Sequence, residues 1–226
     1  RIAVEGPEAF YSGENAQKLS AAVTNAPKTL VPMTEADIAG YQAKERPPVC
    51  GSYRVYTVCG MGPPSSGAVT VLQILKMVER FDLKKWGKDN PLSWHVIAEA
   101  MQLAYADREK YLADRDFVSV PVAGMIDPAY LKSRSALIKT GSTLPAYTAG
   151  NPPGAEPRTA AISSEVAGTS HFVAIDKDGD IATMTSTIES FFGSQLIVNG
   201  YSLNNELTDF TFAPEKDGAP VANRVE

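Results

Sequence analysis

Apolar residues recur at the spacing of an α-helix in three stretches of the chain. These stretches cover residues 7–22, residues 69–81 and residues 94–113. In the first of them, the positions expected in the core are Phe10, Ala16 and Leu19. The pattern therefore predicts three amphipathic helices.

The helix predicted over residues 94–113 has the clearest apolar face. Its expected members are Val96, Ala100, Leu103, Ala104 and Tyr111. By the same spacing, the charged residues of this helix fall on the other side, where we expect them to face solvent. They are Asp107, Arg108 and Glu109. His95 stands at the start of the helix, where packing is a more frequent role than chemistry.

Capping patterns mark shorter helices. Thr34 and Asp37 have the spacing of a capping box, which predicts a helix over residues 35–41. Asp127, which precedes a proline, predicts another helix start. Residues 63–67 read Pro-Pro-Ser-Ser-Gly, and either serine fits a helix N-cap better than a nucleophile, because no histidine or acid stands at a recognisable spacing.

Four stretches have the composition of strands. Residues 49–58 are interpreted as a single strand. Residues 170–176 and 181–188 are joined by Lys-Asp-Gly-Asp, and its Asp-Gly pair favours a tight hairpin turn. Residues 197–203 are the fourth candidate. Between the helical and the hairpin regions, residues 139–168 are rich in Gly, Pro, Ala, Ser and Thr, so we expect a flexible linker at about residues 140–168.

Composition and charge argue against a nucleic-acid-binding protein and against a membrane-spanning one. With 226 residues, of which 44% are hydrophobic, the chain can bury a core. A net charge of −5 without a stripe of Lys and Arg argues against nucleic acid as a partner. No run approaches the roughly 18 apolar residues that cross a bilayer, so no membrane span is predicted.

The two cysteines, Cys50 and Cys59, flank residues 51–58, which belong to the strand predicted at residues 49–58. On one straight strand they would lie about 30 Å apart and could pair only if the chain turned back between them. We therefore expect two free buried thiols. Neither cysteine has the CxxC spacing typical of metal or redox sites.

Thr169 is the first candidate for chemistry. A threonine hydroxyl is a weak nucleophile that needs a base, and the chain has only two histidines. If the Gly168–Thr169 bond is cleaved, the free α-amine of Thr169, with a pKa of about 8, can act as that base. Threonines also begin strands without doing chemistry, so both interpretations stay open on these residues alone.

Several motifs occur in a specific order. Gly-Thr-Ser-His-Phe at residues 168–172 is followed by Thr-Ser-Thr-Ile-Glu-Ser-Phe-Phe-Gly-Ser at residues 185–194 and by Leu-Asn-Asn-Glu-Leu-Thr-Asp-Phe at residues 203–210. Upstream lie the Pro-Pro-Ser-Ser-Gly turn and an Ala-Tyr-Ala-Asp-Arg segment at residues 104–108. Over nearly the whole chain this order resembles the γ-glutamyltranspeptidases, with the first three motifs similar to the start of their small subunit.

The resemblance implies an α+β fold of the N-terminal nucleophile hydrolase type, a four-layer αββα arrangement that is only partial here. It implies that residues 1–168 are the C-terminal part of a large subunit and that residues 169–226 begin the small, catalytic one. The cleavage site would be the Gly168–Thr169 bond, with Thr169 as nucleophile and Thr187 as a hydroxyl in contact with it. The family binds the substrate's α-ammonium group at positions that match Glu189, Glu206 and Asp209, with Asn205 beside them.

Carboxylates suit that role because they supply charge-assisted hydrogen bonds to a compact cation. The residues alone favour a solvated acidic loop instead, and only the motif order favours the pocket. His171, two positions after Thr169, is expected to be structural.

The sequence departs from the family pattern at a few positions. Ser170 stands where threonine is more usual, Glu189 where some members have asparagine, and Ala68 where a second glycine is more usual. The family's oxyanion donors and α-carboxylate ligands belong to segments that this sequence is not expected to contain. The chain is therefore interpreted as the middle of a longer protein, inactive in isolation and in need of the rest of both subunits.

The implied activity is that of a γ-glutamyl acyltransferase and hydrolase. Thr169 would attack the γ-amide of glutathione or a related compound, and water or the amine of an amino acid or peptide would resolve the γ-glutamyl ester. No metal or organic cofactor is implied, and the family's usual location implies the periplasm or secretion. The alternatives are a related acylase, such as a β-lactam side-chain amidase, and a truncated or unprocessed product without turnover.

Overall fold

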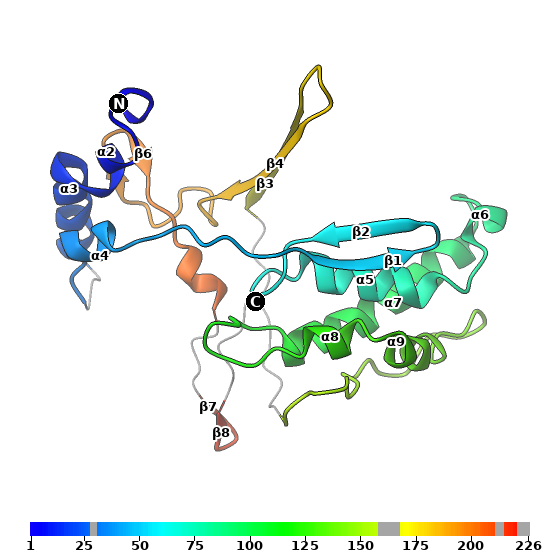
Figure 1. Cartoon of the computed structure of the whole chain (residues 1–226). Coiled ribbons are helices and arrows are strands. Elements are labelled where there is room, and N and C mark those ends of the chain that lie inside the picture. Colours follow the sequence, from blue (N-terminus) through cyan, green and yellow to red (C-terminus); the bar gives the residue numbers. More distant parts are fainter. Residues whose placement is uncertain (28–30, 158–167, 211–214, 221–226) are drawn as a thin grey trace. The chain divides into compact units, whose positions relative to one another are not determined.

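The computed structural model describes residues 1–27, 31–157, 168–210 and 215–220 (Figure 1). The chain divides into two compact units. Unit 1 comprises Arg1–Glu45 and Glu165–Thr208, and unit 2 comprises Arg46–Ser164 and Asp209–Glu226. Each unit thus combines residues from both sides of the Gly168–Thr169 bond.

Unit 1 contains short helices and two hairpins. The helices are α1 (Ile2–Glu5), α2 (Glu8–Tyr11), α3 (Gly13–Thr24) and α4 (Glu35–Ala39). The strands are β3 (Thr169–Ile175), β4 (Ile181–Thr187), β5 (Ile197–Val198) and β6 (Tyr201–Ser202). The 3-10 helix η1 (Glu206–Asp209) follows them and crosses the boundary between the units.

The core of unit 1 forms where α3 and α4 meet β5. Its buried members are Ala16, Leu19, Ile38 and Val198. Ala16 and Leu19 were predicted from the apolar spacing, although the predicted helix is divided at Ser12 into α2 and α3. The capping box is confirmed, because the Thr34 side chain accepts from the Asp37 amide and the Asp37 side chain accepts from the Thr34 amide.

The hairpin predicted after residue 168 is present as β3 and β4, drawn in gold in Figure 1. The strands pair in antiparallel register from Thr169 opposite Thr187 to Ile175 opposite Ile181. Every residue of the two strands except Thr187 is exposed. Within the described chain, both faces of this hairpin are therefore uncovered.

Unit 2 is mainly helical. Its helices are α5 (Gly67–Val78), α6 (Leu83–Trp86), α7 (Pro91–Tyr111), α8 (Val122–Met125) and α9 (Pro128–Ser135). Its strands are β1 (Val49–Tyr53), β2 (Tyr56–Gly60), β7 (Glu215–Lys216) and β8 (Ala219–Pro220). Helix α9 begins as predicted, because the Asp127 side chain accepts from the amide of Tyr130 at 2.8 Å.

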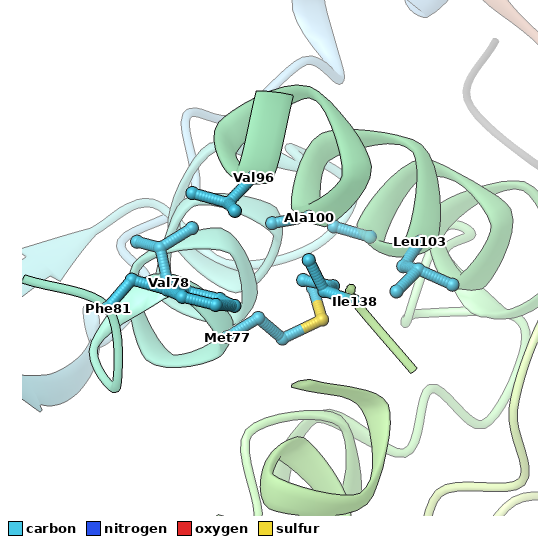
Figure 2. Close-up of a cluster of buried hydrophobic side chains, with 8 residues drawn as sticks. Met77, Val78, Phe81, Val96, Ala100, Leu103 and Ile138 are labelled. Atoms are coloured by element: carbon cyan, nitrogen blue, oxygen red, sulfur yellow. The ribbon is translucent and has the colours of Figure 1, made fainter. Parts of the chain in front are cut away.

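The core of unit 2 lies between α5 and α7. Figure 2 shows apolar side chains of the two helices meeting there, together with residues that follow α5 and α9. They are Met77, Val78, Phe81, Val96, Ala100, Leu103, Ala104 and Ile138. The apolar face predicted for α7 is thus confirmed for Val96, Ala100, Leu103 and Ala104, whereas Tyr111 is buried in a separate cluster. Burial of apolar side chains at about 25 cal/mol per Å² is the main stabilising contribution in this unit.

The prediction of a single strand at residues 49–58 was wrong. The chain reverses at Arg54, which has a φ of 54°, and β1 and β2 pair with Cys50 directly opposite Cys59. The two cysteines form a disulfide with their Cα atoms 4.1 Å apart, so the expectation of free thiols was also wrong. The hairpin lies against α5, since a β-carbon on Gly60 would come within 3.2 Å of the Ala68 β-carbon.

Two charged residues of α7 are buried, contrary to prediction. Asp107 is 0% exposed and Arg108 is 8% exposed. The Asp107 carboxylate pairs with Arg134 at 3.2 Å, and it accepts hydrogen bonds from the Tyr130 hydroxyl at 2.6 Å and the Gly150 amide at 2.8 Å. Burial, together with the hydrogen bond to Asp107, raises the pKa of Tyr130, so this phenol stays protonated as a donor.

The first part of the predicted linker packs against α7. Leu144 and Tyr147 contact the helical core, and the Tyr147 hydroxyl donates to the buried carboxylate of Glu99 at 2.5 Å. This part of the segment therefore buries side chains against the helical core. Residues 158–167 lie outside the described chain, where flexibility stays a prediction.

None of the helices that the structure describes is long and apolar enough to span a membrane.

Candidate functional site

The start of β3 faces the end of β4, and this pairing brings two threonines together. Thr169 is the cross-strand partner of Thr187. The Thr187 hydroxyl donates to the carbonyl oxygen of Gly168 at 3.2 Å and accepts from the amide of Glu189 at 2.7 Å. The Glu189 amide thereby orients the Thr187 hydroxyl toward the carbonyl of the peptide bond that precedes Thr169.

Glu189 turns the chain after β4 and buries its side chain. It has a φ of 68°, and it is 6% exposed. Its carboxylate accepts from the Ser190 hydroxyl at 2.7 Å and from the Asn205 side-chain amide. The Asn205 side-chain oxygen in turn accepts from the amide of Ser190 at 3.1 Å, which closes a ring of hydrogen bonds.

These donors keep Glu189 charged. The hydrogen bond from the Ser190 hydroxyl, followed by that from Asn205, lowers the pKa of Glu189 from its ordinary value despite the opposing effect of burial. Within the described residues, no lysine or arginine forms an ion pair with this carboxylate. The site therefore presents a negative charge that is held by neutral donors alone.

Asn205 and Glu206 follow β6 in a short turn. The amide of Asn205 donates to the Ile188 carbonyl at 3.3 Å, and the amide of Glu206 donates to the Asn204 side chain at 3.0 Å. The structure thus joins Thr187, Glu189 and Asn205 in one network and places Glu206 directly after it. Asp209, the last residue of η1, belongs to the other compact unit.

Sequence reasoning missed one participant, Ser190, whose hydroxyl and amide both contact the Glu189–Asn205 pair. Gly168 was predicted as part of the cleavage site, but its close fit was not predicted. A β-carbon there would come within 1.7 Å of the Glu189 carbonyl oxygen. His171 lies 2.8 Å from the Thr185 hydroxyl through its Nδ1 atom, which agrees with the structural role expected for it.

No group of His, Cys, Asp and Glu in the described parts of the chain is arranged to hold a metal ion.

Comparison with known proteins identifies the family. The family model described as Gamma-glutamyltranspeptidase matches residues 1–226. The chain belongs to the γ-glutamyltranspeptidase family. It is 37% identical over 216 residues to the glutathione hydrolase proenzyme of Escherichia coli K12. The aligned region covers 94% of this chain and 35% of that protein. The chain therefore spans about a third of the length of this relative.

Proteins with other names are also similar to this chain. The acylase ACY 1 proenzyme of Pseudomonas sp. strain SE83 is 37% identical over 214 residues, covering 92% of this chain and 35% of that protein. The solved structure of cephalosporin acylase from Bacillus halodurans matches 100% of this chain and 39% of its own, with a TM-score of 0.77 and 25% identity. The fold is thus α+β, as expected for part of an N-terminal nucleophile hydrolase.

Proposed function

We propose that the parent protein is a γ-glutamyl acyltransferase and hydrolase that matures by cleaving its own Gly168–Thr169 bond. Residues 1–168 then form the C-terminal part of the large subunit, and residues 169–226 begin the small, catalytic subunit. The observation that carries the proposal is the buried, ionised carboxylate of Glu189, which no lysine or arginine among the described residues neutralises.

Hydrogen bonds already stabilise this charge, so a cationic group can pair with the carboxylate without first displacing a proton. The α-ammonium group of a γ-glutamyl compound is such a cation, and it can donate several charge-assisted hydrogen bonds at once. Asn205 lines the same position, and Glu206 and Asp209 complete the ammonium-binding set in this proposal. A substrate whose acyl group lacks an ammonium would leave the Glu189 charge uncompensated.

The contacts around Gly168 support the proposed self-cleavage. The Thr169 hydroxyl attacks the Gly168 carbonyl carbon while the Thr187 hydroxyl, which donates to the Gly168 oxygen, stabilises the developing oxyanion. The C–N bond breaks, the hydroxyl proton ends on the new α-amine, and an ester joins Gly168 to Thr169. Water hydrolyses this ester and leaves Thr169 as an N-terminus.

In turnover, the α-amine of Thr169 takes the proton of its own hydroxyl as the oxygen attacks the γ-carbonyl of the substrate. The amine then passes the proton to the leaving group, and a γ-glutamyl ester remains on Thr169. Water, or the amine of an amino acid or peptide, attacks the ester and restores the free threonine. No step needs a metal or an organic cofactor.

The test uses the full-length parent protein. Denaturing electrophoresis should show two bands that meet at Thr169, and Thr169→Ala should give one band. Purified enzyme should release p-nitroaniline from γ-glutamyl-p-nitroanilide. A Thr169→Ala protein that still cleaves itself would refute the nucleophile.

The second candidate is an acylase, such as a β-lactam side-chain amidase, for an acyl group without an α-ammonium, which the equal identity to the acylase ACY 1 proenzyme favours. Glutaryl-p-nitroanilide separates the two candidates, because it has the same chain length as the γ-glutamyl compound and no α-ammonium group. Turnover of the glutaryl compound alone would refute the γ-glutamyl proposal.

The same proposal places the parent protein in the periplasm or outside the cell. The Cys50–Cys59 disulfide supports this location, because disulfides persist mainly in oxidising compartments. Alkylation of free thiols before mass spectrometry should leave both cysteines unmodified in protein taken from its native source. Alkylated Cys50 and Cys59 would argue for a reducing compartment.

A further inference from the structure

We infer that Asn15 is a positioning residue: it holds the β5–β6 hairpin from the large-subunit side and thereby fixes the loop that carries Asn205. The inference rests on the proposed cleavage, since only a cut between residues 168 and 169 makes this contact an intersubunit one. It assigns the first part of the chain a role in the ammonium site that no motif indicates.

The hairpin is built for a tight reversal. Asn199 and Gly200, at its tip, have φ angles of 50° and 87°, the conformation that an Asn-Gly pair favours between two strands. Val198, just before the tip, is 5% exposed and belongs to the same core cluster as Ala16 and Leu19 of α3. Apolar packing thus anchors the hairpin to α3 but leaves its tip to be oriented by polar contacts.

Asn15 supplies these contacts. It lies in the first turn of α3 and is 6% exposed. Its side-chain oxygen accepts from the Asn199 side-chain amide at 2.7 Å and from the Tyr201 hydroxyl at 3.2 Å. The side-chain amide of Asn15 donates to the Phe10 carbonyl at 2.7 Å, which fixes the orientation of the side chain. A buried asparagine satisfied in this way specifies one arrangement of the groups around it.

The same hairpin leads directly into the site. Leu203, one residue after β6, donates its amide to the Leu196 carbonyl and accepts from the Ser194 amide, each at 2.9 Å. Gly193 fits closely here, because a β-carbon on it would come within 2.1 Å of the Leu203 carbonyl oxygen. Two residues later, Asn205 donates to the Glu189 carboxylate. The chain between the hairpin and the site is therefore too short and too well bonded to move independently.

Two effects follow for the mature enzyme. Loss of the Asn15 contacts leaves the Asn199 amide and the Tyr201 hydroxyl without their acceptor, which weakens the association of the cut chains. It also loosens the loop that binds the α-ammonium, a group distant from the reacting carbonyl. Substrate affinity should therefore fall more than the rate of the chemical step.

The experiment compares Asn15→Ala with Asn25→Ala in the full-length, self-cleaved protein. Asn25 is exposed at the end of the same helix, and among the described residues its side-chain amide donates only to the Ala21 carbonyl, so it is a matched control. With an affinity tag on the large subunit, Asn15→Ala should release the small subunit about tenfold faster in moderate urea. Asn25→Ala should behave as wild type. Equal release from all three proteins would overturn the contact.

Kinetics distinguishes positioning from general destabilisation. For γ-glutamyl-p-nitroanilide, Asn15→Ala should raise KM about tenfold with kcat within about threefold of wild type. Tyr201→Phe should raise KM less, and the double variant should show a smaller increase than the product of the two single ones. A fall in kcat with KM unchanged, or independent effects of the two substitutions, would overturn the positioning role.

A second arm separates this inference from the proposed self-cleavage. A protease recognition sequence inserted between residues 158 and 167 of Thr169→Ala protein allows the chain to be cut without the threonine. Faster release of the small fragment from Asn15→Ala in this background supports the contact even if self-cleavage fails. Equal release here overturns the contact even if self-cleavage is confirmed.

Discussion

Unit 1 buries the carboxylate of Glu189 and unit 2 buries those of Asp107 and Glu99. Of these, Asp107 and Glu189 are compensated in different ways. Asp107 is 0% exposed and pairs with Arg134, while Tyr130, Gln73 and the Gly150 amide donate to it. Glu189 is 6% exposed and receives hydrogen bonds from Ser190 and Asn205 alone among the described residues. Helix α7 thus contains a neutralised charge, whereas the turn after β4 contains an unneutralised one.

The difference separates a structural acid from a binding acid. An ion pair that is complete within the chain has no further partner to recruit, so its removal should be felt as lost stability. A carboxylate kept ionised by neutral donors is prepared for a cation that arrives later, so its removal should be felt as lost affinity. Their exposed fractions alone would not have distinguished the structural role of Asp107 from the binding role of Glu189.

The largest expected effect comes from removing Asp107. Asp107→Ala leaves the buried Arg134 guanidinium without its counter-charge, which should lower the free energy of unfolding by about 3–5 kcal/mol. Thermal unfolding of the parent protein measures this change. The matched control is Asp89→Ala, because the Asp89 side chain is 89% exposed and its loss should change stability by no more than about 0.5 kcal/mol. Equal shifts for the two variants would remove the distinction.

Glu189→Gln should produce the opposite signature. The substitution keeps the size of the side chain and removes only the stability that its ionisation contributes, so the unfolding temperature should fall much less than in Asp107→Ala. KM for γ-glutamyl-p-nitroanilide should rise about 10- to 100-fold, the equivalent of a lost charge-assisted hydrogen bond of about 1.5–3 kcal/mol. Steady-state kinetics with calorimetry on the same samples decides the point. A large loss of stability with unchanged KM would make Glu189 a structural acid like Asp107.

The smallest expected effect is a pH dependence. The Ser190 and Asn205 hydrogen bonds lower the pKa of Glu189 in the folded chain below the ordinary value of 4.5. The stability that its ionisation contributes is therefore fully present above pH 4.5 and is lost as the pH falls through the lower, folded value. Substrate affinity should follow the same course, so KM should stay constant down to about pH 4.5 and rise below it. In Glu189→Gln this rise should be absent, and a rise that persists would assign it to another group.

Local patterns predicted the helices well and the turns less well. The apolar face of α7 and the capping box at Thr34 depend on neighbours within a few residues, which the sequence displays directly. The reversal at Arg54 lacks the glycine or asparagine that usually signals a hairpin, so β1 and β2 were merged into one strand. Because of that error, Cys50 and Cys59 were predicted to lie far apart, whereas the turn between the strands brings them together as a disulfide.

Long-range contacts account for the remaining misses. Asp107 was placed at the surface because its partners, Tyr130, Arg134 and Gly150, lie 23 to 43 positions away in sequence. The motif order indicated Thr187, Glu189 and Asn205, and the structure joins these three in a network. Residues 197–203 were also merged into one strand, although the Asn-Gly pair at residues 199–200 divides them into β5 and β6. Nothing in the sequence linked this pair to Asn15.

The requirement for glycine at position 168 applies only before the chain is cleaved. In the intact chain only glycine fits against the Glu189 carbonyl. After the proposed cleavage the same residue becomes a free C-terminus that nothing obliges to stay there. Natural selection at this position would then act on the uncleaved precursor. A larger residue would impair folding or cleavage of the precursor without changing any contact of the mature enzyme.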